Sequence, residues 1–580
     1  MAAPPRSPLA SEQSVSAVGA RWRELAWGAA VTLLAPLVVF RQMLLSGFGL
    51  VPGNVEDGRL NAFFLEHTWG WVSGKPLHRS LWGLPIFFPG GGNAVAYSDV
   101  MLSFGPLYWP WRALGLPADT SYQLWCLAVL ALSALAAWLF LRRSVGLTPP
   151  VAALGAWLAC CAASRLHQIS HSQLLPLFFV FAGLGGAIAW ARGESRQARW
   201  TASAVTAGSV VAQLWGGFYQ GLFLAVVLAL LTLLAVALPS TRTPLLLRLR
   251  ADWAALLVVG AIAGILLVPW VRHYAAAQRE VGRRPWEAVL PMVPRPASWL
   301  FVSPHALAYR WTEQAPWFTR LPWNFEHAIG LGLLTTACVV AAAILARRRL
   351  AVLLAVATSL LLIAVTTMVH GHTLWRLVVR AVPPLAAARA ISRIGLLLPV
   401  AAAVVLGCAV DGLRGRWRWL ALALLVLCAA EQLSDLEVQR RDVQRFWEED
   451  LRRRIDPHAE AFVATRSSDR GGAMRVHLDA MFAADLAGVP TVNGVSGNEP
   501  PGWYGLQWAR VRNAEAAAAF REALDRWLAT GAVAADRVQW IRLPPGYRGV
   551  EGERHRHGYG GENRPPRPSK RSGSSFHGRG

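Results

Sequence analysis

Two adjacent acidic residues, Glu56 and Asp57, follow the first long apolar run of the chain in the segment NVEDGRLNAFFLEH. After them, Leu60, Phe63 and Phe64 recur at three- and four-residue spacing, which predicts an amphipathic helix. A carboxylate at the boundary of a membrane can accept a proton from a hydroxyl group or hold a metal ion. Asp57 could instead cap the helix and interact with the partial positive charge of its first turn. The sequence leaves both interpretations open.

The tryptophans near this helix, Trp69, Trp71 and Trp82, are residues that favour the interface between lipid and water. We therefore expect the helix to lie on the outer surface of the membrane, with Glu66 on its solvated face. Asp99 is a second acid in the same loop. Two carboxylates that converge from separate places would suit acid–base or metal chemistry, but spacing alone leaves their convergence open.

A second polar group occurs in SRLHQISHSQLLPLFF, between two apolar runs, and includes His167, His171 and Gln173. So many hydrogen-bonding side chains in a short outer turn could line a sugar or phosphate pocket. They could equally be the hydrated residues of a tight loop. The two histidines stand four residues apart and could share a helical face, but a metal site needs a third ligand that this segment does not supply. We therefore predict no metal site here.

Two arginines, Arg389 and Arg393, stand one helical turn apart in RAISRIGLLLP, where an apolar run begins. A guanidinium group binds phosphate through two parallel hydrogen bonds. The alternative is that both side chains only extend to the membrane interface. Glu326, in NFEHAIGLG, precedes another apolar run and could mark a helix start or the rim of a cavity.

The composition is that of a membrane protein, because 54% of the 580 residues are hydrophobic and only 16% are charged. A helix needs about 20 apolar residues to cross a bilayer, and such runs recur along the chain. We predict about eleven spans, near residues 27–47, 122–141, 150–164, 173–191, 201–217, 219–238, 253–271, 328–346, 351–369, 394–412 and 418–433.

Arginines in the short connections predict the orientation of these spans. The loops at 142–149, 192–200, 239–252, 347–350 and 413–417 are all basic, which places them and the N-terminal segment 1–26 in the cytoplasm. With an odd number of spans, the C-terminus and the long loops then lie outside. The predicted organisation is a membrane domain at 27–433 with outer loops 48–121 and 272–327, an outer α/β domain at 434–546, and a disordered tail at 547–580.

The net charge of +23 does not indicate a nucleic-acid partner, because most of it lies in loops between apolar runs and no nucleic-acid-binding motif accompanies it. All six cysteines fall inside apolar runs, which argues against a disulfide framework or a zinc site.

The segment EDGRLNAFFLEH, the long first loop, the many spans and the outer C-terminal region HLDAMFAADLAGVPTVNGVSGNEPPGW resemble the GT-C superfamily of membrane glycosyltransferases, in an uncharacterised bacterial branch. The resemblance implies a GT-C-like fold in the bacterial inner membrane. It implies transfer of a sugar from a polyprenyl-phosphate-linked donor to a glycan, lipid or protein acceptor at the outer face. It also implies a catalytic carboxylate at Asp57, beside Glu56, and a phosphate-binding role for Arg389 and Arg393.

The chain departs from the oligosaccharyltransferase type, since the first loop has no D-x-D and the C-terminal region has no W-W-D. That argues against transfer to peptide asparagine and leaves open whether a divalent cation is required. Two other functions fit the sequence. One is a transporter or flippase of lipid-linked glycans, although the predicted spans hold almost no acids or lysines at their centres and show no repeat. The other is a non-catalytic GT-C-like assembly protein.

Overall fold

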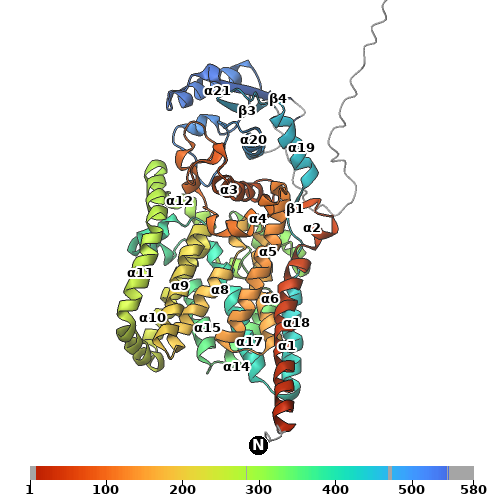
Figure 1. Cartoon of the computed structure of the whole chain (residues 1–580), viewed down its shortest axis with the longest axis vertical. Coiled ribbons are helices and arrows are strands. Elements are labelled where there is room, and N and C mark those ends of the chain that lie inside the picture. The colour runs from red at the N-terminus through yellow and green to blue at the C-terminus, as the bar shows by residue number, and fades with distance from the viewer. Residues whose placement is uncertain (1–7, 283, 468–472, 545–546, 548–580) are drawn as a thin grey trace, which may run out of the picture.

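The structure, a computed structural model, describes residues 8–282, 284–467, 473–544 and 547. The predicted tail therefore lies outside the described residues except for Tyr547. The described chain is mainly helical, and its long helices form one bundle beneath a smaller domain (Figure 1).

Each predicted span coincides with a helix of the bundle. These helices are α1 (Pro8–Val39) with the short α2 (Arg41–Leu45), α5 (Ala118–Leu139), α6 (Pro149–Cys161), α8 (Phe178–Arg192), α9 (Arg196–Gly216), α10 (Phe218–Ala237), α11 (Pro239–Val281), α14 (Leu333–Leu345), α15 (Leu350–Thr366), α17 (Leu398–Gly412) and α18 (Gly415–Glu431). Among the described residues, seven helices are long and apolar enough to cross a membrane, and α14 and α15 are shorter apolar helices.

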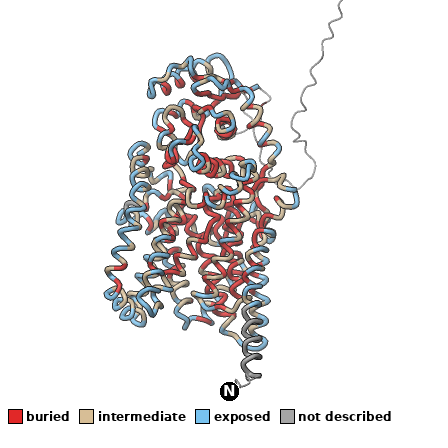
Figure 2. The backbone as a smooth tube through the Cα atoms, viewed as in Figure 1, coloured by how far each residue is buried: buried red, intermediate tan, exposed pale blue. Residues whose placement is uncertain are grey.

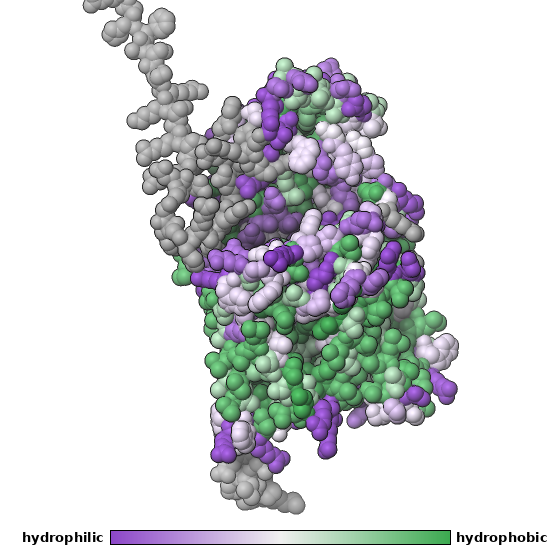
Figure 3. Space-filling view, turned by 180° about the vertical axis from the view of Figure 1, so that it is seen from behind, coloured by the Kyte–Doolittle hydropathy of each residue, from purple (hydrophilic) through white to green (hydrophobic). Residues whose placement is uncertain are grey.

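The bundle has a buried middle and a more exposed outer side (Figure 2). Helix α17 packs against α6, α14 and α15 and is mostly buried, whereas α11 is mostly exposed. Leu257, Ile265 and Leu266 of α11 are more than half exposed. Such side chains are unfavourable in water and favourable in lipid. Figure 3 shows an apolar band across the face of the bundle drawn there, with polar residues above and below it. The chain is therefore built as a helical membrane protein.

The short basic connections meet at the N-terminal end of the bundle. Arg142 pairs with Glu24 of α1 at 2.9 Å, and Arg418 pairs with Asp411 at 3.2 Å. Asp411 also accepts a hydrogen bond from the hydroxyl of Thr148 at 2.7 Å. One predicted loop was wrong, because residues 239–252 form the first part of α11. The side of the membrane on which this end lies stays a prediction.

The first long loop folds at the opposite end of the bundle (Figure 1). It contains β1 (Leu50–Pro52), α3 (Asp57–Val72), three short 3-10 helices (Pro76–His78, Gly91–Tyr97 and Leu102–Leu107) and α4 (Trp109–Ala113). The expectation of a surface helix was wrong: α3 is largely buried, and Glu66 is only 1% exposed. Helix α3 lies between the bundle and the C-terminal domain, which cover it from two sides.

The later loops contain mostly short helical turns. The second holds α12 (Trp286–Val289), α13 (Pro316–Thr319) and 3-10 helices at Leu290–Met292, Pro296–Trp299, Leu307–Glu313 and Asn324–His327. The third holds α16 (Trp375–Ala381) and a 3-10 helix at Pro383–Ala387, and a further 3-10 helix (Ile391–Leu397) leads into α17.

The C-terminal region combines helices with two short sheets. Its elements are β2 (Val438–Arg440), α19 (Arg441–Arg452), β3 (Ala461–Arg466), α20 (Ala473–Ala487), a 3-10 helix (Trp503–Leu506), α21 (Ala514–Ala529), a 3-10 helix (Ala535–Arg537) and β4 (Val538–Leu543). Strand β2 pairs with β1 of the first loop in antiparallel register, with Leu50 opposite Arg440. Strands β3 and β4 are parallel, so a long connection through α20 and α21 must join them. The first sheet thus ties this region to the loop that carries α3.

Candidate functional site

Asp57 lies in the first turn of α3, but its carboxylate does not cap this helix. The side chain of Asn54 accepts hydrogen bonds from the backbone N–H groups of Glu56 at 3.1 Å and Gly58 at 3.0 Å. Asn54 therefore supplies the oxygen that satisfies the free N–H groups at this helix end. The side chain of Asp57 is 39% exposed, so its carboxylate remains accessible to a ligand. Asn54, and not Asp57, therefore has the capping role that the sequence left open for Asp57.

His171 and Arg393, from two distant parts of the chain, meet beside Asp57. The Nε2 atom of His171 lies 3.5 Å from an Asp57 oxygen and 2.7 Å from Nη2 of Arg393. A guanidinium group only donates hydrogen bonds, so Nε2 of His171 must be the acceptor and the ring proton sits on Nδ1. Burial lowers the pKa of His171, and the charge of Arg393 lowers it further. His171 is therefore a neutral imidazole that separates the carboxylate from the guanidinium.

Glu326 completes the buried part of this group. It accepts two hydrogen bonds from Arg393, at 3.0 Å from Nε and 2.5 Å from Nη2, and both side chains are 6% exposed. Burial alone would raise the pKa of Glu326, but the charge and hydrogen bonds of Arg393 outweigh it and lower that pKa to about 2. The guanidinium also lies over the ring of Tyr219, 5.0 Å from its centroid. Arg393 is thus held by an acid, an imidazole and an aromatic face, and its expected role as a free phosphate ligand does not match these contacts.

Asp99 and Gln173 lie together on another side of Arg393. Asp99 is 6% exposed and accepts a hydrogen bond from the backbone N–H of Phe218 at 2.6 Å, at the start of α10. Burial raises the pKa of Asp99, whereas Phe218, Arg393 and Gln173 lower it. Arg393 interacts electrostatically with both Asp57 and Asp99. The charge of Arg393 therefore acts on both acids of the first loop, but Arg393 forms no ion pair with either of them among the described residues.

His167 has a structural role, whereas the side chain of Arg389 stays partly exposed. Both ring nitrogens of His167 are used, with Ser303 Oγ at 2.9 Å and the carbonyl oxygen of Phe325 at 3.0 Å, so this histidine holds the second loop against the bundle. Arg389 is half-buried. Its backbone N–H donates to the hydroxyl of Tyr219 at 3.1 Å.

Two further residues belong to the site, and sequence reasoning missed both of them. Glu437, just before β2, accepts a hydrogen bond from Ser170 at 2.8 Å. Burial raises its pKa, and so do the charges of Asp57 and Glu56, although Ser170 opposes them. Burial and the charge of Asp57 also raise the pKa of Glu56. Glu437 lies far from the first loop in sequence, and no local motif marks it.

Arg284 is the other missed residue. It donates to the carbonyl of Gly497 and to the side chain of Asn498, both at 2.7 Å. Burial lowers the pKa of Arg284, and the nearby charge of Arg389 lowers it further. Within the described ranges, neither Arg284 nor Arg389 forms an ion pair with a carboxylate. The charges of Arg284 and Arg389 therefore act on each other at this end of the bundle.

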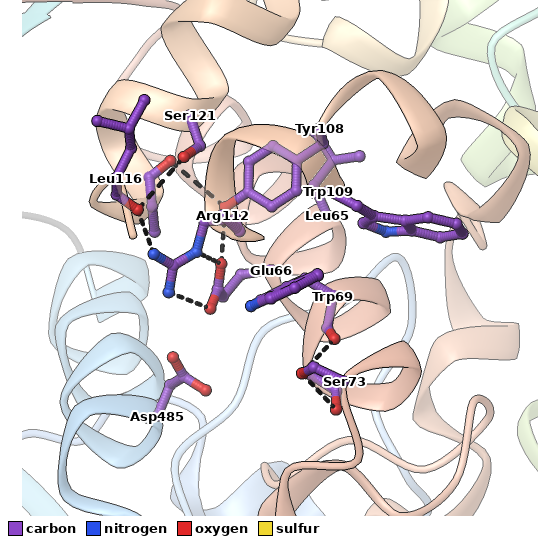
Figure 4. A network of polar contacts seen from close by, with 12 residues as sticks. Leu65, Glu66, Trp69, Ser73, Tyr108, Trp109, Arg112, Leu116, Ser121 and Asp485 are labelled. Atoms are coloured by element: carbon purple, nitrogen blue, oxygen red, sulfur yellow. Dashed lines mark hydrogen bonds and ion pairs between the residues drawn. The ribbon is translucent and has the colours of Figure 1, made fainter. Parts of the chain in front are cut away.

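A separate polar network holds the middle of α3 (Figure 4). Glu66 accepts two hydrogen bonds from Arg112, at 2.7 and 2.9 Å, and one from the hydroxyl of Tyr108 at 2.7 Å. Lys75 bridges Glu66 at 2.9 Å to Asp485 of α20 at 3.7 Å. These contacts explain why a carboxylate can be buried at position 66.

In the part of the chain that the structure describes, no group of three or more His, Cys, Asp or Glu side chains is arranged to hold a metal ion. The site combines the partly exposed carboxylate of Asp57 with a buried Glu326–Arg393–His171 chain, and Arg284 and Arg389 interact electrostatically beside it.

No protein-family model matches the chain, and no curated protein matches it. Among solved structures, the chain is similar to the arabinofuranosyltransferase AftD from Mycobacteria, determined by single-particle cryo-EM. The match has 15% sequence identity and a TM-score of 0.43. It covers 77% of this chain and 30% of that one, so the chain spans less than a third of the length of AftD.

Proposed function

We propose that this chain is an integral membrane glycosyltransferase, which moves a sugar from a polyprenyl-phosphate-linked donor to an acceptor at the outer face of the membrane. The single observation that carries the proposal is the position of Asp57. Its carboxylate is partly exposed and not needed for helix capping, and it lies beside a buried charged group at the end of an apolar bundle. The resemblance of the first-loop segment to GT-C enzymes points to the same residue.

Arg389 and Arg284 are the side chains best placed to bind the donor phosphate. Their charges act on each other, and Arg393 is already held by Glu326 and His171. Guanidinium groups favour a phosphate, because each supplies charge and paired N–H donors. The polyprenyl chain would remain in the bilayer beside the apolar bundle, so the phosphate would reach the site at the level of the membrane surface.

In the proposed reaction, the acceptor hydroxyl gives its proton to the Asp57 carboxylate while its oxygen attacks the anomeric carbon of the donor sugar. The bond between that carbon and the phosphate oxygen breaks, and the polyprenyl phosphate leaves with the electron pair. A single displacement of this kind inverts the anomeric configuration. A base positioned in this way accelerates such a step by about 10²–10⁴-fold. His171, Arg393 and Glu326 hold the surroundings of the carboxylate but take no proton in this step.

The test begins with cells that carry or lack the gene, in which a comparison of lipid-linked sugars and surface glycans identifies the donor to use. The purified protein is then assayed with that donor, with and without a chelator, which also decides whether a divalent cation is needed. Asp57→Asn should lower the transfer rate by about 10²–10⁴-fold without changing the melting temperature.

Asp442→Asn is the matched control, because Asp442 is an exposed acid on α19 whose ion pair with Arg440 is local. It should transfer sugar at the normal rate. Transfer at the normal rate by Asp57→Asn would exclude the proposed mechanism. Unchanged glycans and lipid-linked sugars in cells without the gene would favour the non-catalytic alternative.

A further inference from the structure

Arg59 lies two residues after Asp57 in α3, yet its side chain is directed into the C-terminal domain. Its guanidinium pairs with Glu448 of α19 at 2.8 Å and with Asp479 of α20 at 2.7 Å. The side chain is 1% exposed and lies over the ring of Phe482, 5.3 Å from its centroid. The same ring packs edge-on against Phe63 of α3 at 5.5 Å. The C-terminal domain therefore holds α3 through one buried cation and one aromatic contact.

The opposite side of the same helical turn is fixed by the bundle. Asn61 donates from its side chain to the backbone oxygens of Asp57 at 2.8 Å and Ser170 at 3.2 Å. Gly58 packs against Gly53 so closely that an added Cβ would lie 3.1 Å from the Gly53 backbone. The turn that carries Asp57 is thus held between the loop at Ser170 and the C-terminal domain.

From these contacts we infer that Arg59 is a positioning residue for Asp57, and that the C-terminal domain acts through it to fix the carboxylate toward the acceptor. This inference rests on the proposed function, because it assigns Arg59 a role in that reaction. Arg59 does not touch the reacting atoms. Its guanidinium joins two helices of the domain to the first turn of α3, and a displacement of about 1 Å in a catalytic group can lower a rate by about 10²-fold.

The charges around Arg59 allow its role in positioning Asp57 to be tested separately from a purely structural role. One cation faces two buried acids, and Gln444 donates to Glu448 at 2.9 Å. The hydroxyl of Tyr547 donates to Asp479, and Arg475 interacts with the same acid. Burial and the charge of Asp479 together raise the pKa of Glu448 to about 7, despite the opposing charge and hydrogen bond of Arg59.

The direction of that shift determines how stability depends on pH. The folded-state pKa of Glu448 lies above its ordinary value of 4.5. Its contribution to stability is therefore present below pH 4.5 and is lost as the pH rises through about 7. Replacing Glu448 by glutamine removes this loss, so Glu448→Gln should melt at the same temperature as the wild type or higher at alkaline pH. A buried ionic group can be replaced by a neutral one without destabilising a protein.

The experiment compares Glu448→Gln and Arg59→Lys with the wild type. Hydrogen exchange measures the protection of the backbone N–H groups at residues 58–61, and the transfer assay gives kcat and KM. Both variants should exchange faster in this turn, and kcat should fall by about 10-fold with KM for the donor unchanged. We expect the wild-type kcat to change near pH 7 as Glu448 titrates, and we expect this change to be absent from Glu448→Gln.

Arg452→Gln is the control, because Arg452 lies on the same helix and its ion pair with Glu449 is exposed and within that helix. It should leave exchange at residues 58–61 and kcat unchanged. Wild-type exchange and wild-type kcat in Glu448→Gln would overturn the inference. It would also be overturned if a lower melting temperature of Glu448→Gln accounted for its whole loss of activity. Hydrogen exchange tests the contact between Arg59 and the C-terminal domain even if the protein transfers no sugar. Failure of the proposed function can therefore be distinguished from failure of this inference.

Discussion

Arg393 donates a hydrogen bond from Nη2 to Nε2 of His171 across 2.7 Å, and this contact sets the protonation state of the imidazole. The proton of the neutral ring lies on Nδ1, which is buried. Because His171 lies between Arg393 and Asp57, its state determines the electrostatic environment of the carboxylate. The contact joins residues that are 222 positions apart in the sequence.

We predict that His171 makes the protein less stable in mild acid. Its folded-state pKa lies below the ordinary value of 6.5, because of burial and then Arg393, so the unfolded chain binds a proton more readily than the folded protein. Stability is therefore present above pH 6.5 and falls as the pH drops below it. The melting temperature of His171→Gln should fall less on acidification than that of the wild type. His458→Gln, at an exposed histidine, should follow the wild-type curve. Identical curves for His171→Gln and the wild type would contradict this prediction.

Glu326→Ala should destabilise the protein by about 3–5 kcal/mol, because it leaves Arg393 buried and unpaired. The double variant Glu326→Gln/Arg393→Gln should recover much of this loss, since it buries no charge. Denaturant titration of the protein in detergent measures both.

The same pair predicts a pH dependence in strong acid. The pKa of Glu326 is lowered to about 2, so its contribution is complete above the ordinary value of 4.5 and is lost as the pH falls toward about 2. Glu449→Gln is the control, since the pair of Glu449 with Arg452 is exposed and should contribute about 1 kcal/mol or less. Equal effects of Glu326→Ala and Glu449→Gln would contradict the buried pairing.

Gly70→Ala should weaken the junction between α3 and the C-terminal domain. An added Cβ would lie 2.4 Å from the His78 ring, so the ring would have to move. His78 contacts His67 between their Nδ1 atoms at 2.8 Å and Asp485 of α20 at 2.7 Å, so its displacement breaks both contacts. Overpacking of this kind costs about 1–3 kcal/mol.

Gly208→Ala is the matched control, because Gly208 is also helical and an added Cβ there meets no atom within 4 Å. It should be neutral or slightly stabilising, since alanine favours helices. Thermal melting compares the two variants, and the prediction for Gly70 would be wrong if both melt with the wild type.

Hydropathy predicted the helices of the bundle correctly, because segments of this kind need apolar residues whatever they pack against. The orientation that the arginines of the short loops indicate stays a prediction. The error at residues 239–252 has a simple cause. Arginines suggested a loop there, but α11 begins at Pro239 and includes the whole segment.

The candidate site was less predictable. Asp57 and Arg393 were named from their positions at the ends of apolar runs, and the structure brings them together through His171. The partners that define their chemistry were not visible. Glu66 was expected to face solvent, but Arg112 and Lys75 come from other segments to bury it. Arg284 and Glu437 stand in no motif, so only their neighbours in space reveal them.

The amino-acid sequence by itself determined the membrane class of this protein, the helical segments and the acidic start of the first loop. These features depend on local composition and periodicity, which act over a few turns of chain. Only the tertiary structure decided which carboxylate stays accessible and which is neutralised. This outcome depends on burial and on charges brought from distant segments. The same type of acid is solvated in water, pairs with a nearby guanidinium group, or has a raised pKa beside another acid.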